Sequence, residues 1–309
     1  MTTDPDGFMK SGLHVTHHAS AAALLERARD TLEVAEAENG LLLGILAAPP
    51  PVVERGDAAL WMSVDAGPAC EGVALRTPPH NLLLSRTSPA PLEALVHELA
   101  ARATREEIAL PGVSGPRETA HTFADSWARA TGATSATTMR QGLYELTRVI
   151  MPLALPPGAL RVARPDEADQ LAEWMTGFAR DAQLPLSEHA TLRRSVAARI
   201  AAGALFVWDD AGEARSMAAL QGRTRRGIRV SMVYTPVELR GRGYATACVA
   251  AVSALALASG RRFCTLYTDL TNPTSNAIYQ RVGYRLIGES AMIAFASAAS
   301  APCRANTEA

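Results

Sequence analysis

One stretch decides the fold: Val230-Ser231-Met232-Val233-Tyr234-Thr235-Pro236-Val237-Glu238-Leu239-Arg240-Gly241-Arg242-Gly243-Tyr244-Ala245. A β-branched, apolar run ends at Pro236, a short turn containing Gly241 and Gly243 follows, and an alanine-rich segment then runs from Thr246 to Ser259. This order predicts a strand, a tight loop and a helix. Glycine lets the loop turn sharply, and the first turn of a helix offers unpaired N–H groups at the positive end of its dipole. The stretch therefore predicts a cradle for a phosphate or pyrophosphate.

The spacing within this loop excludes two common phosphate-binding loops, because it matches neither Gly-x-x-x-x-Gly-Lys-Ser/Thr nor Gly-x-Gly-x-x-Gly. The residues Arg240-x-x-Gly243-x-Ala245 resemble instead the acetyl-CoA signature of the GNAT superfamily of N-acetyltransferases, Gln/Arg-x-x-Gly-x-Gly/Ala. The simpler alternative is an ordinary strand-to-helix turn, in which the glycines serve only the backbone geometry.

A second motif follows about thirty residues further along the chain. Residues 263–268 are apolar and β-branched and predict a buried strand. Asn272 before Pro273 is typical of a helix start, and Gly283 ends that helix. With Asn276 and Tyr279 between them, these residues resemble the other half of the GNAT signature. Taken alone, Asn272 is explained by a helix cap, and Tyr279 by a core aromatic residue.

The predicted fold class is a mixed-sheet α/β fold of the GNAT-like acyl-CoA N-acyltransferase type, in two tandem copies. The order β-α-α-β-β-β-α-β-α-β over residues 159–297 resembles the GNAT order, after a proline-rich linker at residues 151–158. Residues 1–150 repeat that order weakly, starting with a predicted strand at residues 41–47, and are expected to form a degenerate copy. An unrelated α/β domain is the alternative. Residues 298–309 are expected to be a disordered tail.

The first half lacks a recognisable cradle. After its fourth predicted strand, at residues 81–85, the chain reads Arg86-Thr87-Ser88-Pro89-Ala90-Pro91, with no glycine. The two prolines also lack N–H donors. We therefore expect this half to bind no acetyl-CoA and to shape the substrate cleft instead.

The composition excludes several classes of protein. The 30 basic and 31 acidic residues nearly balance, so nothing marks a nucleic-acid or membrane-surface protein. No apolar stretch is long enough to span a membrane. The four scattered cysteines fit reduced thiols in a cytoplasm, and His14, His17 and His18 are expected to lie in an exposed segment rather than in a metal site. We expect a monomer or homodimer.

The resemblance implies a direct attack of a small-molecule primary amine on the thioester of acetyl-CoA. The Val233 N–H would stabilise the developing oxyanion, and Tyr279 would be the general acid at the departing sulfur. The residues that the resemblance assigns to acetyl-CoA binding are Met232, Val233, Tyr234, Arg240, Gly241, Arg242, Gly243, Tyr244, Ala245, Asn272 and Asn276.

The general base, the acceptor and the acyl chain length stay open. Glu238, Asp269 and Glu188 are candidate bases by chain position, and a water relay would need none of them. An acyl-CoA sensor or pseudoenzyme without turnover is the alternative function. The arginines of residues 223–226 most simply form a solvated hairpin turn, and a nucleic-acid role for them has little support.

Overall fold

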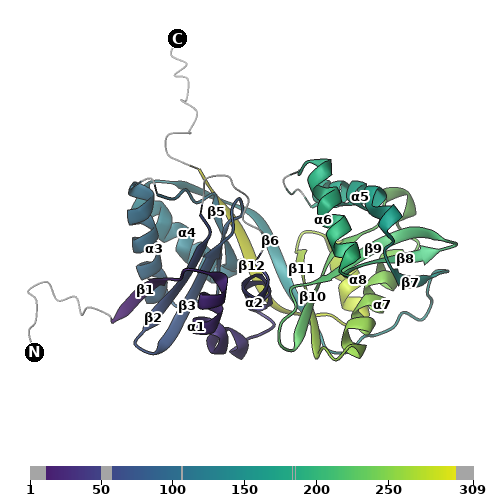
Figure 1. Ribbon diagram of the computed structural model, residues 1–309, viewed down its shortest axis with the longest axis horizontal. Helices are drawn as coiled ribbons and strands as arrows, with labels where there is room; N and C mark the ends of the chain where they lie inside the picture. The colour runs from purple at the N-terminus through teal and green to yellow at the C-terminus, as the bar shows by residue number, and fades with distance from the viewer. Residues whose placement is uncertain (1–11, 50–57, 106, 183, 185, 297–309) are drawn as a thin grey trace, which may run out of the picture. The chain divides into compact units, whose positions relative to one another are not determined.

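The computed structural model describes residues 12–49, 58–105, 107–182, 184 and 186–296. The predicted tail at residues 298–309 lies outside these ranges. Among the described residues, the chain forms two compact units. The first takes in the residues up to Ala35, those from Ile45 to Arg140 and those from Ser290 onward; the second takes in Glu36–Gly44 and Gln141–Glu289. Strands and helices mix in both, as the predicted fold class requires (Figure 1).

In the first unit the strands follow the order β1-β2-β3-β4-β5-β12-β6. They are β1 (Leu13–His17), β2 (Leu60–Ala66), β3 (Ala69–Arg76), β4 (Leu82–Leu84), β5 (Gly112–Pro116), β12 (Arg285–Ala296) and β6 (Thr134–Leu146). The helices are α1 (Ala21–Val34), α3 (Pro89–Thr104) and α4 (Arg117–Thr131). Apolar side chains of α3 and α4 pack with β2, β4 and β5 into one core, with Phe123 and Leu99 fully buried.

In the second unit the order is β6-β11-β10-β9-β8-β7. The strands are β7 (Ala159–Val162), β8 (Leu205–Asp210), β9 (Glu213–Gln221), β10 (Gly227–Tyr234) and β11 (Phe263–Asp269), with the end of β6. The helices are α5 (Ala168–Asp181), α6 (His189–Ala201), α7 (Tyr244–Ala258) and α8 (Pro273–Val282), with the 3-10 turns η1 (Pro165–Glu167) and η2 (Val237–Leu239).

Alternating residues divide the second unit into layers. On β8, Leu205 and Val207 pack with α5 and α6, whereas Phe206 and Trp208 pack with α7 and α8. Since successive side chains of a strand point to opposite faces, the two helix pairs cover opposite faces of this sheet (Figure 1).

The boundary between the units differs from the predicted one at residue 150. Residues 141–146 of β6 pair with β11 and belong to the second unit. Residues 290–294 of β12, predicted to close the second copy, pair with β5 in the first unit. Residues 36–44 also belong to the second unit. Periodicity identifies a strand but not its partner, which explains the difference.

One predicted element was wrong in type. Residues 41–47, predicted as a strand, form the helix α2 (Gly40–Ala47). The run is Gly-Leu-Leu-Leu-Gly-Ile-Leu-Ala, in which leucine and alanine favour a helix and β-branched residues are nearly absent. The histidine segment contributes β1, in which His14 and His17 are exposed as predicted, and His17 contacts Glu98 at 3.0 Å.

Candidate active site

The centre of the candidate site is an opening between β10 and β11. The two parallel strands pair only over Gly227–Arg229 and Phe263–Thr265. The register of β10 against β9 then shifts between Ser231 and Tyr234, where Met232 has a left-handed φ of 53°. Such a bulge bends a strand away from its neighbour. The two strands therefore diverge at residues 232–234, and the main-chain groups beyond the bulge have no partner on β11.

The loop after this opening has the geometry of an anion cradle. Gly241 and Gly243 have φ of 76° and 84°, which residues with a Cβ adopt only under strain. Among the described residues, no acceptor pairs with the six consecutive N–H groups from Gly241 to Thr246; the next, that of Ala247, bonds to the Gly243 oxygen at 3.0 Å. These exposed donors lie at the start of α7, where the helix dipole adds positive potential.

The side chains of the loop hold it in place. The Tyr244 side chain is buried and its hydroxyl donates to Asp210 Oδ2 at 2.8 Å, so only its amide faces the cradle. Arg242 is exposed and donates from Nη2 to the Glu238 oxygen at 3.2 Å. Arg240 bonds to the main chain at Thr235, forms an ion pair with Asp181 and lies 5.6 Å from the centre of the Tyr234 ring.

The two asparagines of the second motif have structural partners. Asn272 is the N-cap of α8 and accepts a hydrogen bond from the Ser275 N–H at 3.1 Å. Asn276 donates from Nδ2 to the main-chain oxygens of Asp269 at 3.1 Å and Leu270 at 3.3 Å. The buried Oδ1 of Asn276 has no partner and is thus available to a donor from a ligand. Capping of α8 alone accounts for Asn272, whereas Asn276 keeps one hydrogen-bond acceptor, Oδ1, without a protein partner.

Tyr279 lies on α8 and is only 8% exposed. Its ring meets that of Tyr284 edge-on, with centroids 6.0 Å apart. Burial raises the pKa of the Tyr279 phenol well above its ordinary value, so the hydroxyl stays protonated at neutral pH. The Val233 side chain packs against the same hydrophobic cluster as the Tyr279 side chain.

The three candidate bases are not brought together. Asp269 Oδ1 accepts hydrogen bonds at 2.8 Å from both the N–H and the hydroxyl of Thr271, which commits it to a local turn. Glu238 and Glu188 are exposed, on η2 and at the start of α6. No buried carboxylate with a partner that could tune it as a base stands among these three.

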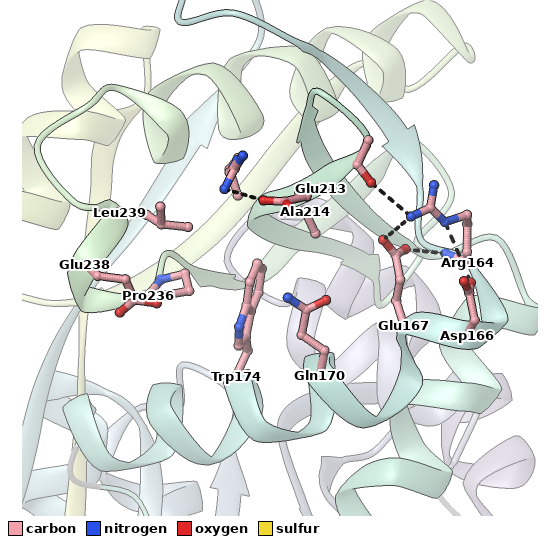
Figure 2. Close-up of a pocket in the computed structure, with 12 residues that line it drawn as sticks. Arg164, Asp166, Glu167, Gln170, Trp174, Glu213, Ala214, Pro236, Glu238 and Leu239 are labelled. Carbon is pink, nitrogen blue, oxygen red and sulfur yellow. Dashed lines mark hydrogen bonds and ion pairs between the residues drawn. The ribbon is translucent and has the colours of Figure 1, made fainter.

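A polar cavity of about 620 Å³ adjoins the cradle on the α5 side. Figure 2 shows Gln170 and Trp174 rising from α5 between the Pro236–Leu239 turn on one side and the Arg164–Glu167 cluster on the other. Glu167 is buried, and its carboxylate accepts from Arg161 at 2.6 and 2.8 Å and from the Arg164 N–H at 2.7 Å. Burial favours the neutral acid, but these hydrogen bonds outweigh it and lower the pKa of Glu167.

Sequence reasoning missed a group of polar residues near the opening. The group consists of Arg229 and Ser231 on β10 and Tyr267 on β11, whose polar side chains are all partly or fully shielded from solvent. In the sequence, each of them is a single polar residue in an apolar strand beside an arginine-rich turn. Only the alternation of side chains between the two faces of a strand could have placed them on a common face.

The first half has no equivalent of the cradle. None of residues 85–91 has a positive φ, and α3 begins with Pro89 and Pro91 in its first turn.

In the described part of the chain, no three His, Cys, Asp or Glu side chains gather as a metal site. Within the same residues, no helix combines the length and apolar character needed to cross a bilayer.

Comparison with known proteins identifies the fold. Residues 211–293 match the family model described as FR47-like protein. No curated protein matches the chain. Among solved structures, a GNAT-family acetyltransferase from Colwellia psychrerythraea has a TM-score of 0.56 at 14% identity, over 91% of this chain and 98% of that one.

Two further structures agree along most of the chain. A GCN5-related N-acetyltransferase from Sphaerobacter thermophilus has a TM-score of 0.60 at 14% identity, over 93% and 96% of the two chains. A tandem GNAT protein from the clavulanic acid biosynthesis pathway has a TM-score of 0.56 at 13% identity, over 92% and 98%. The chain thus shares its fold with solved structures of GNAT acetyltransferases, and residues 211–293 match the FR47-like family model.

Proposed function

We propose that the second unit transfers an acetyl group from acetyl-CoA to the primary amine of a small molecule or amino acid derivative. The observation that carries this proposal is the row of six unpaired amides from Gly241 to Thr246, directly after the opened end of β10. A diphosphate is a ligand that such a row suits, because several N–H groups can share its charge.

The residues present fit acetyl-CoA. A Cβ on Gly241 would meet open space, and one on Gly243 would meet only Pro156 Cδ at 3.7 Å, so the loop leaves room for a phosphate against its backbone. Acetyl-CoA supplies an acyl group activated as a thioester. The opening between β10 and β11 would admit its narrow arm, and Asn276 Oδ1 would accept a hydrogen bond from an amide of that arm.

Two steps of the transfer would use a residue of this site. The acceptor nitrogen forms the new C–N bond as the C–S bond breaks. The Val233 N–H, on the strand beyond the bulge, would bind the carbonyl oxygen as it gains charge. Tyr279 would donate its proton to the leaving sulfur, which its raised pKa permits at neutral pH. The proton of the attacking amine would pass to water, because Glu188 and Glu238 lie exposed in solvent and Asp269 is bonded to Thr271.

Calorimetric titration with acetyl-CoA tests the donor, and release of free CoA thiol with a panel of amines tests the reaction. We expect binding in the absence of any acceptor and thiol release that depends on the amine. No heat of binding would refute the cradle. Binding without thiol release from any amine would favour the second candidate, a sensor of acyl-CoA, for which the intact cradle is equally suited.

A further inference from the structure

Two arginines on the α5–α6 face of the second unit are partly buried and pair with no carboxylate among the described residues. The side chain of Arg229, on β10, makes no hydrogen bond or ion pair within the described ranges, and its Nη1 is shielded from solvent. Arg199, on α6, donates to Ser195 and, at 3.5 Å, to Gln221 Oε1, all of them neutral acceptors. Burial lowers the pKa of both guanidinium groups.

The two arginines approach each other through Gln221. Gln221 on β9 is the cross-strand partner of Arg229, so their side chains stand on the same face of the sheet. Met217 and Ala219, which share that face with Gln221, pack beneath α5 and α6. Gln221 thus lies between the guanidinium groups of Arg199, on α6, and Arg229, on β10.

The groups around Arg229 are polar but uncharged. The Tyr267 hydroxyl on β11 is the titratable group close enough to affect it, and Glu38 affects Tyr267 rather than Arg229. Burial raises the pKa of Tyr267 to about 12, so that hydroxyl is neutral at physiological pH. The Nη1 atom of Arg229 also lies beside Gly222, where a Cβ would come within 3.3 Å of it. No carboxylate of the described part of the chain therefore neutralises this guanidinium.

An arginine in such surroundings lowers the stability of the fold unless a bound anion supplies the missing counter-charge. Burying a charge without a counter-charge is unfavourable, and the rigid fork of a guanidinium matches the two oxygens of a carboxylate. Ser231, the next residue of β10 on the same face, has a buried hydroxyl with no partner. Arg229 and Ser231 together offer several donors to one anion.

We propose that Arg229, assisted by Ser231 and backed by Arg199, binds a carboxylate of the acceptor, so that the acceptor is an amine that also bears a carboxylate. This inference rests on the proposed acetyl transfer and names its substrate class. Arg229 is the last residue of β10 paired with β11, and Val233 lies four residues beyond it, about 13 Å along an extended strand. A carboxylate held at Arg229 would direct the rest of the molecule towards the opening.

The experiment compares ligands that differ only in this charge. Wild-type protein is titrated with amino acids and ω-amino acids, each beside its carboxamide, and with phosphoethanolamine, while melting temperature and heat of binding are recorded without acetyl-CoA. We expect the carboxylates to bind at least about tenfold more tightly than their carboxamides, as is typical of a charge-assisted hydrogen bond. Equal binding, or tighter binding of the phosphate compound, overturns the inference.

Variants assign the preference to one residue. Arg229→Gln should reduce carboxylate affinity to that of the carboxamide, and Arg229→Lys should retain part of it, since lysine keeps the charge but loses the fork. Arg223→Gln, an exposed arginine on the same hairpin, is the matched control and should change nothing. A carboxylate preference that survives in Arg229→Gln contradicts the assignment.

Turnover separates this inference from the proposed function. If carboxylates bind through Arg229 but acetyl-CoA neither binds nor releases thiol, the acetyl transfer is wrong and the anion site stands. If acetyl-CoA is consumed equally with carboxylate and carboxamide amines, the transfer stands and the substrate class is wrong. The wild-type comparison needs no variant, so a failure of Arg229→Gln to fold leaves the result interpretable.

Discussion

The Arg240 side chain donates from Nε to the main-chain oxygen of Thr235 at 3.0 Å, across the base of the cradle loop. With its ion pair to Asp181, this bond ties the two ends of η2 together and to the end of α5. Arg240 thus shapes the loop. Because its side chain already has two protein partners, we expect its effect on ligand affinity to be indirect.

Replacing this arginine should loosen the cradle without removing its donors. Arg240→Gln should weaken acetyl-CoA binding about fivefold, the value of one ordinary hydrogen bond, because the amides of residues 241–246 are unchanged. Asp181→Asn should have a smaller effect, since that ion pair is exposed on both sides. Calorimetry on both variants measures the two effects. A loss of a hundredfold or more for Arg240→Gln would show direct contact with the diphosphate instead.

Gly243→Val should abolish acetyl-CoA binding while the protein stays folded. The valine side chain would stand where a phosphate approaches the loop, at a φ of 84° that also strains the backbone. Gly260→Val is the matched control, because Gly260 follows the other end of α7, has a φ of 90° and has open space around its Cβ position. Similar melting temperatures with binding lost only in Gly243→Val would separate the ligand clash from the strain. Normal affinity in Gly243→Val would refute the cradle.

Tyr279→Phe should lower kcat roughly tenfold to a hundredfold and leave the affinity for acetyl-CoA unchanged. Because burial raises the pKa of this phenol, its deprotonation should produce no fall in kcat up to pH 10. Tyr284→Phe is the control: that hydroxyl pairs with Ser253 Oγ at 2.9 Å in the core, so its loss should cost about 1 kcal/mol of stability with kcat retained. Equal kcat in Tyr279→Phe and wild type would remove the acid role.

Glu36→Gln should destabilise the second unit by about 2 kcal/mol near neutral pH. The Glu36 side chain is 1% exposed and pairs with Arg226 Nε at 2.6 Å, with further hydrogen bonds from Thr224 Oγ1 and the Arg226 N–H at 2.6 Å. Urea denaturation at pH 7 measures the change. Thr224→Val, which removes one neutral donor, should cost less.

The same carboxylate should make stability depend on acid. Burial favours the protonated form of Glu36, but the hydrogen bonds from Thr224 and Arg226 outweigh it and lower its pKa. A carboxyl whose pKa is depressed on folding stabilises the protein above its unfolded pKa and loses that contribution as pH falls through the folded pKa. Wild-type stability should therefore drop below about pH 4.5 more steeply than that of Glu36→Gln. Parallel pH profiles would contradict this.

The core of the second unit was readable from the sequence because its signals are local. The β10–cradle–α7 segment follows from Pro236, two glycines and an alanine run, although α7 begins at Tyr244 rather than at the predicted Thr246. Helix α8 follows from Asn272-Pro273 and Gly283, at the bounds that the structure shows. The hairpin at residues 223–226 was also predicted correctly, since Thr224 N bonds to the Gly227 oxygen at 3.1 Å.

What the sequence did not reveal depends on contacts between distant residues. Glu36 and Arg226 are 190 positions apart, and no local pattern pairs them. Arg229 lies only three residues after the exposed Arg226. Its pairing with Gln221 in the β9–β10 ladder is what directs its side chain to the α5–α6 face of the sheet. The helix α2 was mistaken for a strand because a short apolar run fits both.

The distribution of β6 and β12 between the two units has a consequence for the gene. Cutting the chain within residues 151–158 would separate the rest of the second unit from residues 141–146, the strand segment that borders β11, and from Glu36. The residues before this cut are therefore indispensable to the second unit, whatever they bind themselves. Deleting them would leave β11 with an unpaired edge and Arg226 without its carboxylate partner.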